Sequence, residues 1–287
     1  MNPDNKVLAC VDRSHFADFV ADYAAWAACR MHAPLEFLHV IDRHPEIGSG
    51  KDHSGAIGID AQETLLKQIT EEEQIRTKAE RERGREFLNR LRERALAAGA
   101  EAVDMRQRHG GLVDTLVEQE QGVRLVVLGR RGASAESSGR DIGRNVERVT
   151  RSLHTPVLTV TEGFKPPRRV LIAYDGSAVT RRGVELVASS PVFSGLQVHL
   201  LMCGKAGADA DRKLQQARAG LEAHGMNVVA SFLPGDLEAG IVRTVRDAGI
   251  DLLIMGAYSH SPLRSLLLGS KTTDLLRAST IPTLLLR

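Results

Sequence analysis

The sequence lacks the features that mark several classes of protein. Its three cysteines, Cys10, Cys29 and Cys203, are too few and too scattered for a disulfide framework or a metal site. No run of about 18 apolar residues occurs, so we expect no membrane span. A formal net charge of +2 gives no sign of the concentrated basic face that nucleic-acid binding needs. Met1 leads almost directly into an apolar strand pattern with no signal sequence, so we expect a soluble, cytoplasmic protein.

Catalytic motifs are missing too. The chain has no G-x-x-x-x-G-K-[S/T] loop, no SGGxDS loop and no G-x-S-x-G turn around a nucleophile. Its ten histidines are scattered, and His39 and His199 lie in apolar strand patterns, where we expect packing or hydrogen bonding. Only His260 lies in a loop of interest. We therefore predict no catalytic residue and no metal ligand, and at most a weak ATPase.

What the chain has instead is an internal repeat. Its 287 residues suit two domains better than one, and 43% hydrophobic content is ample for α/β cores. Four apolar segments recur in the same order, alternating with helical patterns such as Phe16, Phe19, Val20, Tyr23 and Ala27. The paired segments are 6–12 with 169–175, 35–41 with 196–202, 123–128 with 250–255, and 155–160 with 281–286. A period this long indicates two copies of one domain, and the alternation indicates a parallel sheet covered on both faces.

The two copies differ in length between the second and fourth strands. Asp12 and Asp175 are 163 positions apart but Gly129 and Gly256 only 127 apart, so the first copy has 36 extra residues, at about 42–77. We predict a helix that begins with Asp60 as its N-cap and becomes amphipathic further on, at Phe87, Leu88, Leu91 and Ala95. The insertion is either a disordered loop with a solvated helix or a mobile lid or partner surface near a cavity.

A glycine-containing loop follows the fourth strand of the second copy. The strand ends at Gly256, nine residues separate Ser259 from Gly269-Ser270, and a helical pattern follows. Glycine lets the backbone approach an anion, and a helix N-terminus offers free N–H groups. This pattern predicts a phosphate cradle, in which Lys271 and Arg264 are candidate phosphate partners.

The chain resembles the universal stress protein family, whose nucleotide loop is written G-x-x-G-x(9)-G-[S/T]. Here Gly256, Ser259 and Gly269-Ser270 take those places, with Ser259 replacing the second glycine. The resemblance implies two tandem Rossmann-like α/β domains, each a five-stranded parallel sheet of order 3-2-1-4-5 with helices on both faces. It also implies pairing of the halves through their last strands. We place the domains at 1–162 and 168–287, joined by the linker from Glu162 to Pro167.

The resemblance also implies a nucleotide site, mainly in the second half, with Asp175 beside the adenosine. The predicted nucleotide-binding residues are Asp175, Gly176, Met202, Gly256, Ser259, Gly269, Ser270, Lys271 and Thr272. A second, degenerate site would use Asp12, Val40, Gly129, Gly132, Gly143, Arg144 and Asn145, where the spacing is ten residues and Arg144 stands in place of serine. The first loop is also basic, through Arg130, Arg131, Arg140 and Arg144, either to hold an anion or to face water.

The sequence thus favours a cytoplasmic stress-response protein that binds ATP, ADP or AMP, with Mg²⁺ accompanying ATP, as a sensor or regulator. A non-nucleotide interaction protein, or a binder of another small or lipid-like ligand beneath the 42–77 segment, is the alternative. A slow ATP hydrolase is a third interpretation. We expect an intramolecular pseudo-dimer, and a homodimer is open.

Overall fold

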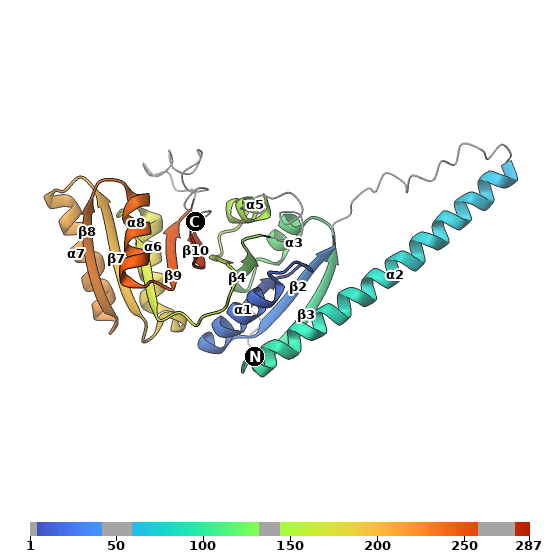
Figure 1. Ribbon diagram of the computed structural model, residues 1–287, viewed down its shortest axis with the longest axis horizontal. Coiled ribbons are helices and arrows are strands. Elements are labelled where there is room, and N and C mark those ends of the chain that lie inside the picture. The colour runs from blue at the N-terminus through green and yellow to red at the C-terminus, as the bar shows by residue number, and fades with distance from the viewer. Residues whose placement is uncertain (1–4, 42–58, 132–143, 258–278) are drawn as a thin grey trace.

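The structure is a computed structural model that describes residues 5–41, 59–131, 144–257 and 279–287 (Figure 1). Side chains are described throughout these ranges except at 59–74, 76 and 144. The first half contains β1 (Lys6–Cys10), α1 (Ala17–Met31), β2 (Leu35–Ile41), α2 (Ile59–Ala97), β3 (Val103–His109), α3 (Leu112–Gln119), β4 (Val123–Gly129), α5 (Arg144–Ser152) and β5 (Val157–Val160). The second half contains β6 (Arg169–Ala173), α6 (Ala178–Ser189), the 3-10 helix η1 (Pro191–Phe193), β7 (Gln197–Gly204), α7 (Ala208–Ala223), β8 (Asn227–Pro234), α8 (Leu237–Ala248), β9 (Leu252–Gly256) and β10 (Thr283–Leu286).

All these strands join one ten-stranded sheet, in the order β3-β2-β1-β4-β5-β10-β9-β6-β7-β8. Within each half every pairing is parallel, and the third, second, first, fourth and fifth strands follow one another across the sheet. The predicted order 3-2-1-4-5 is therefore confirmed in both halves.

The halves meet through their last strands. β5 and β10 pair antiparallel, with Leu158 opposite Leu284 and Thr159 opposite Thr283. The Thr159 hydroxyl donates to the carbonyl oxygen of Thr283 (3.1 Å), and both threonines are completely buried. This pairing covers two apolar strand edges that would otherwise be open. It also turns the two halves end for end, so the carboxyl ends of their parallel strands lie at opposite ends of the sheet.

Helices cover both faces of the sheet, which explains why the strands are apolar on both sides. On one face α1, α2, α6 and α7 pack against alternate residues such as Val7, Ala9 and Val127. On the other face α3, α5 and α8 pack against Leu8, Cys10 and their counterparts. Cys10 is buried on this face as a small core residue, while Cys203 is half-buried. In α1 the predicted apolar face is inside, with Phe19 only half-buried.

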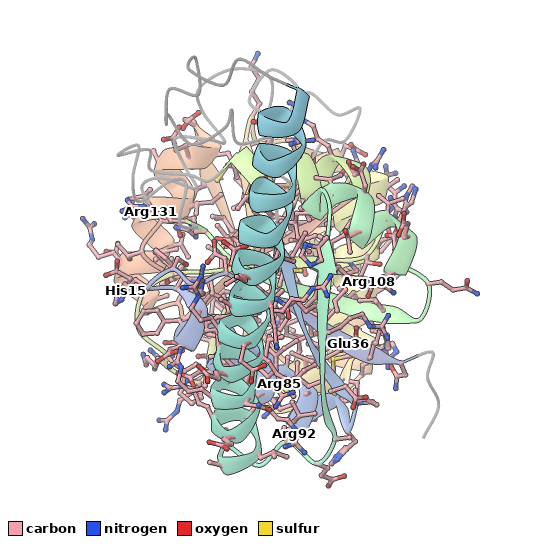
Figure 2. The ribbon with its side chains drawn as sticks, turned by 90° about the vertical axis from the view of Figure 1, so that its right-hand side faces the viewer. His15, Glu36, Arg85, Arg92, Arg108 and Arg131 are labelled. Atoms are coloured by element: carbon pink, nitrogen blue, oxygen red, sulfur yellow. The ribbon has the colours of Figure 1, made fainter. Side chains whose placement is uncertain are left out.

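Residues 59–77 of the insertion form the N-terminal half of one helix, α2, whose 39 residues would span about 58 Å at 1.5 Å per residue. Figure 1 shows its N-terminal part pointing away from the sheet, and Figure 2 looks onto its side. Its C-terminal part packs on the sheet through the buried Leu88, Leu91 and Ala95, as predicted. The prediction that Asp60 is the N-cap was wrong, because the helix already includes Ile59, and a boundary of this kind shifts easily by a residue or two. Residues 42–58, the first part of the 42–77 segment predicted as a lid or partner surface, lie outside the described ranges.

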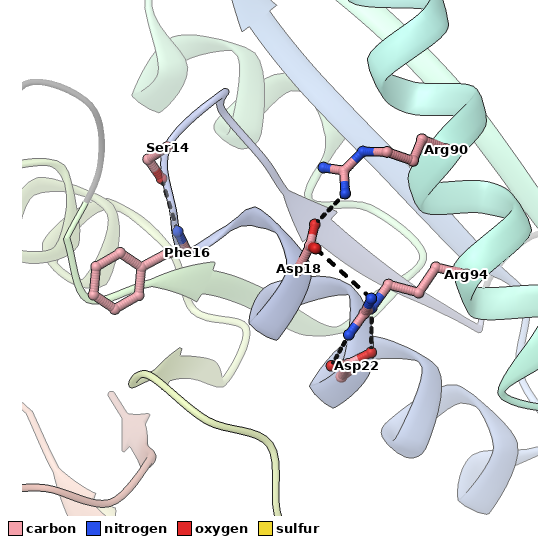
Figure 3. A network of polar contacts seen from close by, with 6 residues as sticks. All are labelled: Ser14, Phe16, Asp18, Asp22, Arg90 and Arg94. Carbon is pink, nitrogen blue, oxygen red and sulfur yellow. Dashed lines mark hydrogen bonds and ion pairs between the residues drawn. The ribbon is translucent and has the colours of Figure 1, made fainter.

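Ion pairs fix α2 to α1 (Figure 3). Arg90 Nη1 lies 2.7 Å from Asp18 Oδ1, and Arg94 donates to both carboxylate oxygens of Asp22 (2.6 and 2.8 Å). These groups are partly exposed, so each pair contributes modestly, about 0–1 kcal/mol. Gly84 adds close packing, since a Cβ there would lie 2.4 Å from Gln107 Nε2 on β3. The C-terminal half of α2, which follows the insertion, is thus attached to the first helix of the domain as well as to its edge strand.

Candidate functional site at the carboxyl ends of the strands

In each half, the strand order reverses between the first and fourth strands, and ligands of open α/β sheets bind at such a point. In the second half β6 and β9 are paired with Ala173 opposite Met255. Gly256 follows Met255 directly and Asp175 follows Ala173 by two residues, so both lie at adjacent strand ends. Met202 lies at the end of the next strand, one residue beyond the partner of Ala173. The structure therefore brings together three of the predicted residues that are distant in sequence.

Asp175 organises the turn into α6. Its Oδ1 accepts hydrogen bonds from the Ser177 amide (2.9 Å) and the Thr180 hydroxyl (2.7 Å). Gly176, between Asp175 and Ser177, has φ +74°, a left-handed conformation that glycine adopts without strain. Ser177 then caps α6 by accepting from the Thr180 amide (3.3 Å). The half-buried carboxylate is thus held in a fixed orientation at the sheet edge.

The glycines that close β4 and β9 have a packing role. A Cβ on Gly256 would lie 3.1 Å from Val179 Cγ1, and one on Gly129 would lie 2.9 Å from Phe16 Cβ. Val179 and Phe16 are equivalent, each four residues after the aspartate that ends the first strand. In both halves the glycine therefore lets the start of the helix that follows the first strand approach the end of the fourth strand. The approach is closer in the first half, where the distance to Phe16 Cβ is 2.9 Å, against 3.7 Å to Val179 Cβ in the second.

Two cations lie beside the turn after β6, and neither was among the predicted site residues. Arg181 Nη1 donates to the Gly176 carbonyl (2.5 Å). Lys213, from α7, lies so near that a Cβ on Gly176 would be 2.8 Å from its Cδ, and its Nζ pairs with Asp209 (2.7 Å). Basic spacing in α7 alone indicates only a solvated helix, so no signal in the sequence could have identified Lys213. Positive charge beside Asp175 favours an anionic ligand.

The first half repeats this arrangement with differences. Asp12 Oδ1 accepts from the Ser14 amide (3.1 Å), and Asp12, Val40 and Gly129 lie at the ends of β1, β2 and β4. His39 is buried, with Nδ1 2.9 Å from the Val11 carbonyl oxygen and its ring against Phe87 of α2, so the prediction of a packed, hydrogen-bonded histidine is confirmed.

The role expected for Arg130 was wrong. Arg130 neither faces water nor is available to hold an anion in its loop, because its side chain is 5% exposed and contacts the second half. Its guanidinium donates to the carbonyl oxygens of Ser279 and Ile281 (2.8 Å to the latter) and to Thr283 Oγ1 (3.2 Å). Burial, and then the charge of Arg131, lower the pKa of Arg130 to about 10, so it stays protonated at neutral pH. Arg130 is therefore a link between the halves.

The phosphate loops themselves lie outside the described residues. This applies to Ser259, His260, Arg264, Gly269, Ser270, Lys271 and Thr272, and in the first half to Gly132, Arg140 and Gly143. Arg144 begins α5 directly after Gly143, and Asn145 is exposed in its first turn. A helix therefore does start where the first loop was predicted to close. Among the described residues no group of three or more histidine, cysteine or acidic side chains could hold a metal ion.

Comparison with known proteins decides the family. The model of the universal stress protein family matches residues 5–161 and 204–287. A universal stress protein of Synechocystis sp. is 34% identical over 98% of this chain and 99% of its own length. The chain belongs to the universal stress protein family. Solved structures agree with the fold: one from Archaeoglobus fulgidus, also a universal stress protein, covers 99% of this chain and 96% of its own at TM-score 0.71 and 18% identity.

A structure from Pseudomonas aeruginosa also matches, at TM-score 0.61 and 15% identity, with 98% of this chain and 92% of the other covered. As a tandem universal stress protein, the chain carries both copies of the family fold in a single sheet. Within the described part, no helix has the length and apolar character needed to cross a bilayer.

Proposed function

We propose that this universal stress protein binds an adenine nucleotide (ATP, ADP or AMP) in its second half, and acts in the cytoplasm as a sensor or regulator. The observation that carries the proposal is the convergence of Asp175, Met202 and Gly256 at three adjacent strand ends, with Lys213 and Arg181 beside them. The choice of adenine nucleotide rests on the family. The two domains, at 1–162 and 168–287, would then differ in function, because the nucleotide would bind mainly in the second.

The residues present suit such a ligand. The carboxylate of Asp175, held in a fixed orientation, can accept a hydrogen bond from a ribose hydroxyl. Met202 offers an apolar surface against which a base can pack. Lys213 could move from Asp209 to a phosphate oxygen, since its side chain is 41% exposed. The proposed phosphate contacts are Gly256, Ser259 and the pair Gly269-Ser270, followed by Lys271 and Thr272, and Mg²⁺ would accompany ATP. We propose binding and signalling instead of rapid turnover.

Mass spectrometry of the small molecules released from freshly purified, denatured protein tests the proposal. We expect one adenine nucleotide per chain or less, and its loss in Lys213→Met. Lys205→Met, which removes an exposed lysine just after β7, is the matched control and should retain the nucleotide. Absence of nucleotide from the wild type, together with no binding of added ATP, would refute the proposal.

A further inference from the structure

A cavity of about 40 Å³ lies at the seam between the two halves. It sits on the sheet face covered by α1 and α6, over the central strands β5 and β10. The paired residues Leu158 and Leu284 form part of its lining, and Trp26 of α1 and Leu186 of α6 contribute from the two halves. Both halves therefore build the cavity.

The wall made by η1 is held in place by α1. Arg30 Nε donates to the Val192 carbonyl (2.6 Å), and its Nη2 donates to the Ser194 carbonyl. Protein interiors are normally packed to the density of organic crystals, so space between two fixed elements is space that a small ligand can fill. A cavity lined mainly by apolar groups with a few polar ones is also the usual form of a small-molecule site.

The polar side chains of the lining share one property: Trp26, Ser190 and Arg124 are all hydrogen-bond donors, and no carboxylate is among the lining residues. Within the described part of the chain, neither the Trp26 indole nor the Ser190 hydroxyl has a side-chain hydrogen bond. The exposed Arg124 has one, from Nη1 to Asn5 Oδ1 (3.0 Å). Its remaining guanidinium donors can serve a ligand. An acceptor with negative charge is the complement of this set.

We propose that the seam cavity binds a small amphipathic carboxylate, with its alkyl end between Trp26 and Leu186 and its carboxylate against Arg124. Only a few carbon atoms fit inside, since an engineered cavity of about 150 Å³ is needed for benzene. The rest of the ligand lies in the mouth. This site differs from the proposed nucleotide sites: Leu125 and Leu252 of its lining lie near the amino ends of β4 and β9, whereas Gly129 and Gly256 end those strands.

Trp26 is the only tryptophan of the chain, so its fluorescence reports on this cavity alone. The full chain is titrated with hexanoate at pH 7 and constant ionic strength, and with hexanol as the neutral counterpart. We expect a saturable fluorescence change with hexanoate that excess ATP does not abolish. Arg124→Gln should raise the Kd for hexanoate about tenfold, the usual scale of a charged hydrogen bond, and leave hexanol unchanged. Arg168→Gln, at an exposed arginine without a side-chain hydrogen bond among the described residues, should change neither.

Leu186→Phe tests the location, because the larger side chain of this half-buried residue should fill the cavity and abolish both titrations. Should that variant fail to fold, the exposed pair Arg124→Gln and Arg168→Gln still decides. The proposal is overturned if the wild type shows no saturable response by fluorescence or calorimetry. It is also overturned if hexanoate and hexanol bind with the same Kd and Arg124→Gln changes neither value, which indicates an apolar void. Binding to folded Leu186→Phe as tight as to the wild type overturns it as well.

Discussion

Replacing Arg130 with methionine should weaken the junction between the halves. The change keeps an unbranched apolar stem but removes a guanidinium that donates to Ser279, Ile281 and Thr283 of the other half. Thr283 is completely buried, so water cannot easily replace the lost donor. Residues 279–283 lead into β10, and so the effect should be felt at the pairing of β5 with β10.

The magnitude follows from two opposing terms. Hydrogen bonds donated by a charged group contribute about 1.5–3 kcal/mol each. Burying the guanidinium costs several kcal/mol, which is the same effect that lowers its pKa to about 10. Removing the charge recovers that cost but leaves buried acceptors without a donor. We expect a net loss of about 2–4 kcal/mol in the free energy of unfolding, or about 3–7 °C in Tm for a chain of 287 residues.

Urea unfolding of the full chain, followed by circular dichroism, measures this loss. Arg168→Met is the matched control, since it removes the same charge from an exposed side chain, and it should change stability by less than about 0.5 kcal/mol. If Arg130→Met is as stable as Arg168→Met, the reasoning is wrong and the guanidinium does not hold the halves together.

Two further predictions concern titration. Burial would raise the pKa of Asp251, but bonds from Lys165 Nζ (2.5 Å) and the amides of Arg168 (3.0 Å) and Arg169 (3.1 Å) outweigh it and lower that pKa. Its stabilisation is thus complete above the unfolded pKa of about 4 and lost as pH falls through the folded pKa. Asp251→Asn should destabilise the protein at pH 7 but much less at pH 3 by urea unfolding, and an equal loss at both would contradict this. Burial, and then Glu36, raise the pKa of Cys10 to about 12, so an aromatic disulfide reagent at pH 8 should leave Cys10 unmodified until the protein unfolds. Rapid labelling of Cys10 in the native state, located by peptide mass mapping, would show that this burial is wrong.

The sequence predicted those strands that are buried on both faces. β2 runs from Leu35 to Ile41, as its mainly apolar pattern indicated, although Glu36 and His39 interrupt that pattern. β3 and β8 were not identified from their residues, because both lie at the edges of the sheet. β3 reads Val103-Asp-Met-Arg-Gln-Arg-His109 and buries only its first side chain, so it lacks the apolar run by which the other strands were recognised. The order of the strands came from the family resemblance and could not have come from periodicity.

The candidate site was predictable only where local chemistry reveals it. An aspartate at a strand end with a serine two residues later is typical of a turn, and Asp175 and Asp12 do form such turns. The roles of Lys213 and Arg130 could not be predicted from the sequence, for a different reason. Lys213 depends on how α7 packs beside α6, and Arg130 depends on the antiparallel docking of the halves, so their contacts span many residues of sequence. Packing of Gly256 against Val179 likewise follows from the fold.

Calorimetric titration of ATP into the wild type, Asp175→Ala and Asp12→Ala tests the central claim most directly. Both substitutions remove an equivalent turn contact, to the Ser177 amide in one half and the Ser14 amide in the other, so the pair controls for local destabilisation. We predict that the wild type binds ATP and that Asp175→Ala raises the Kd about tenfold or more, as loss of a buried acceptor does. Asp12→Ala should bind like the wild type. Equal effects of the two substitutions would contradict a site in the second half, and no heat with the wild type would contradict nucleotide binding itself.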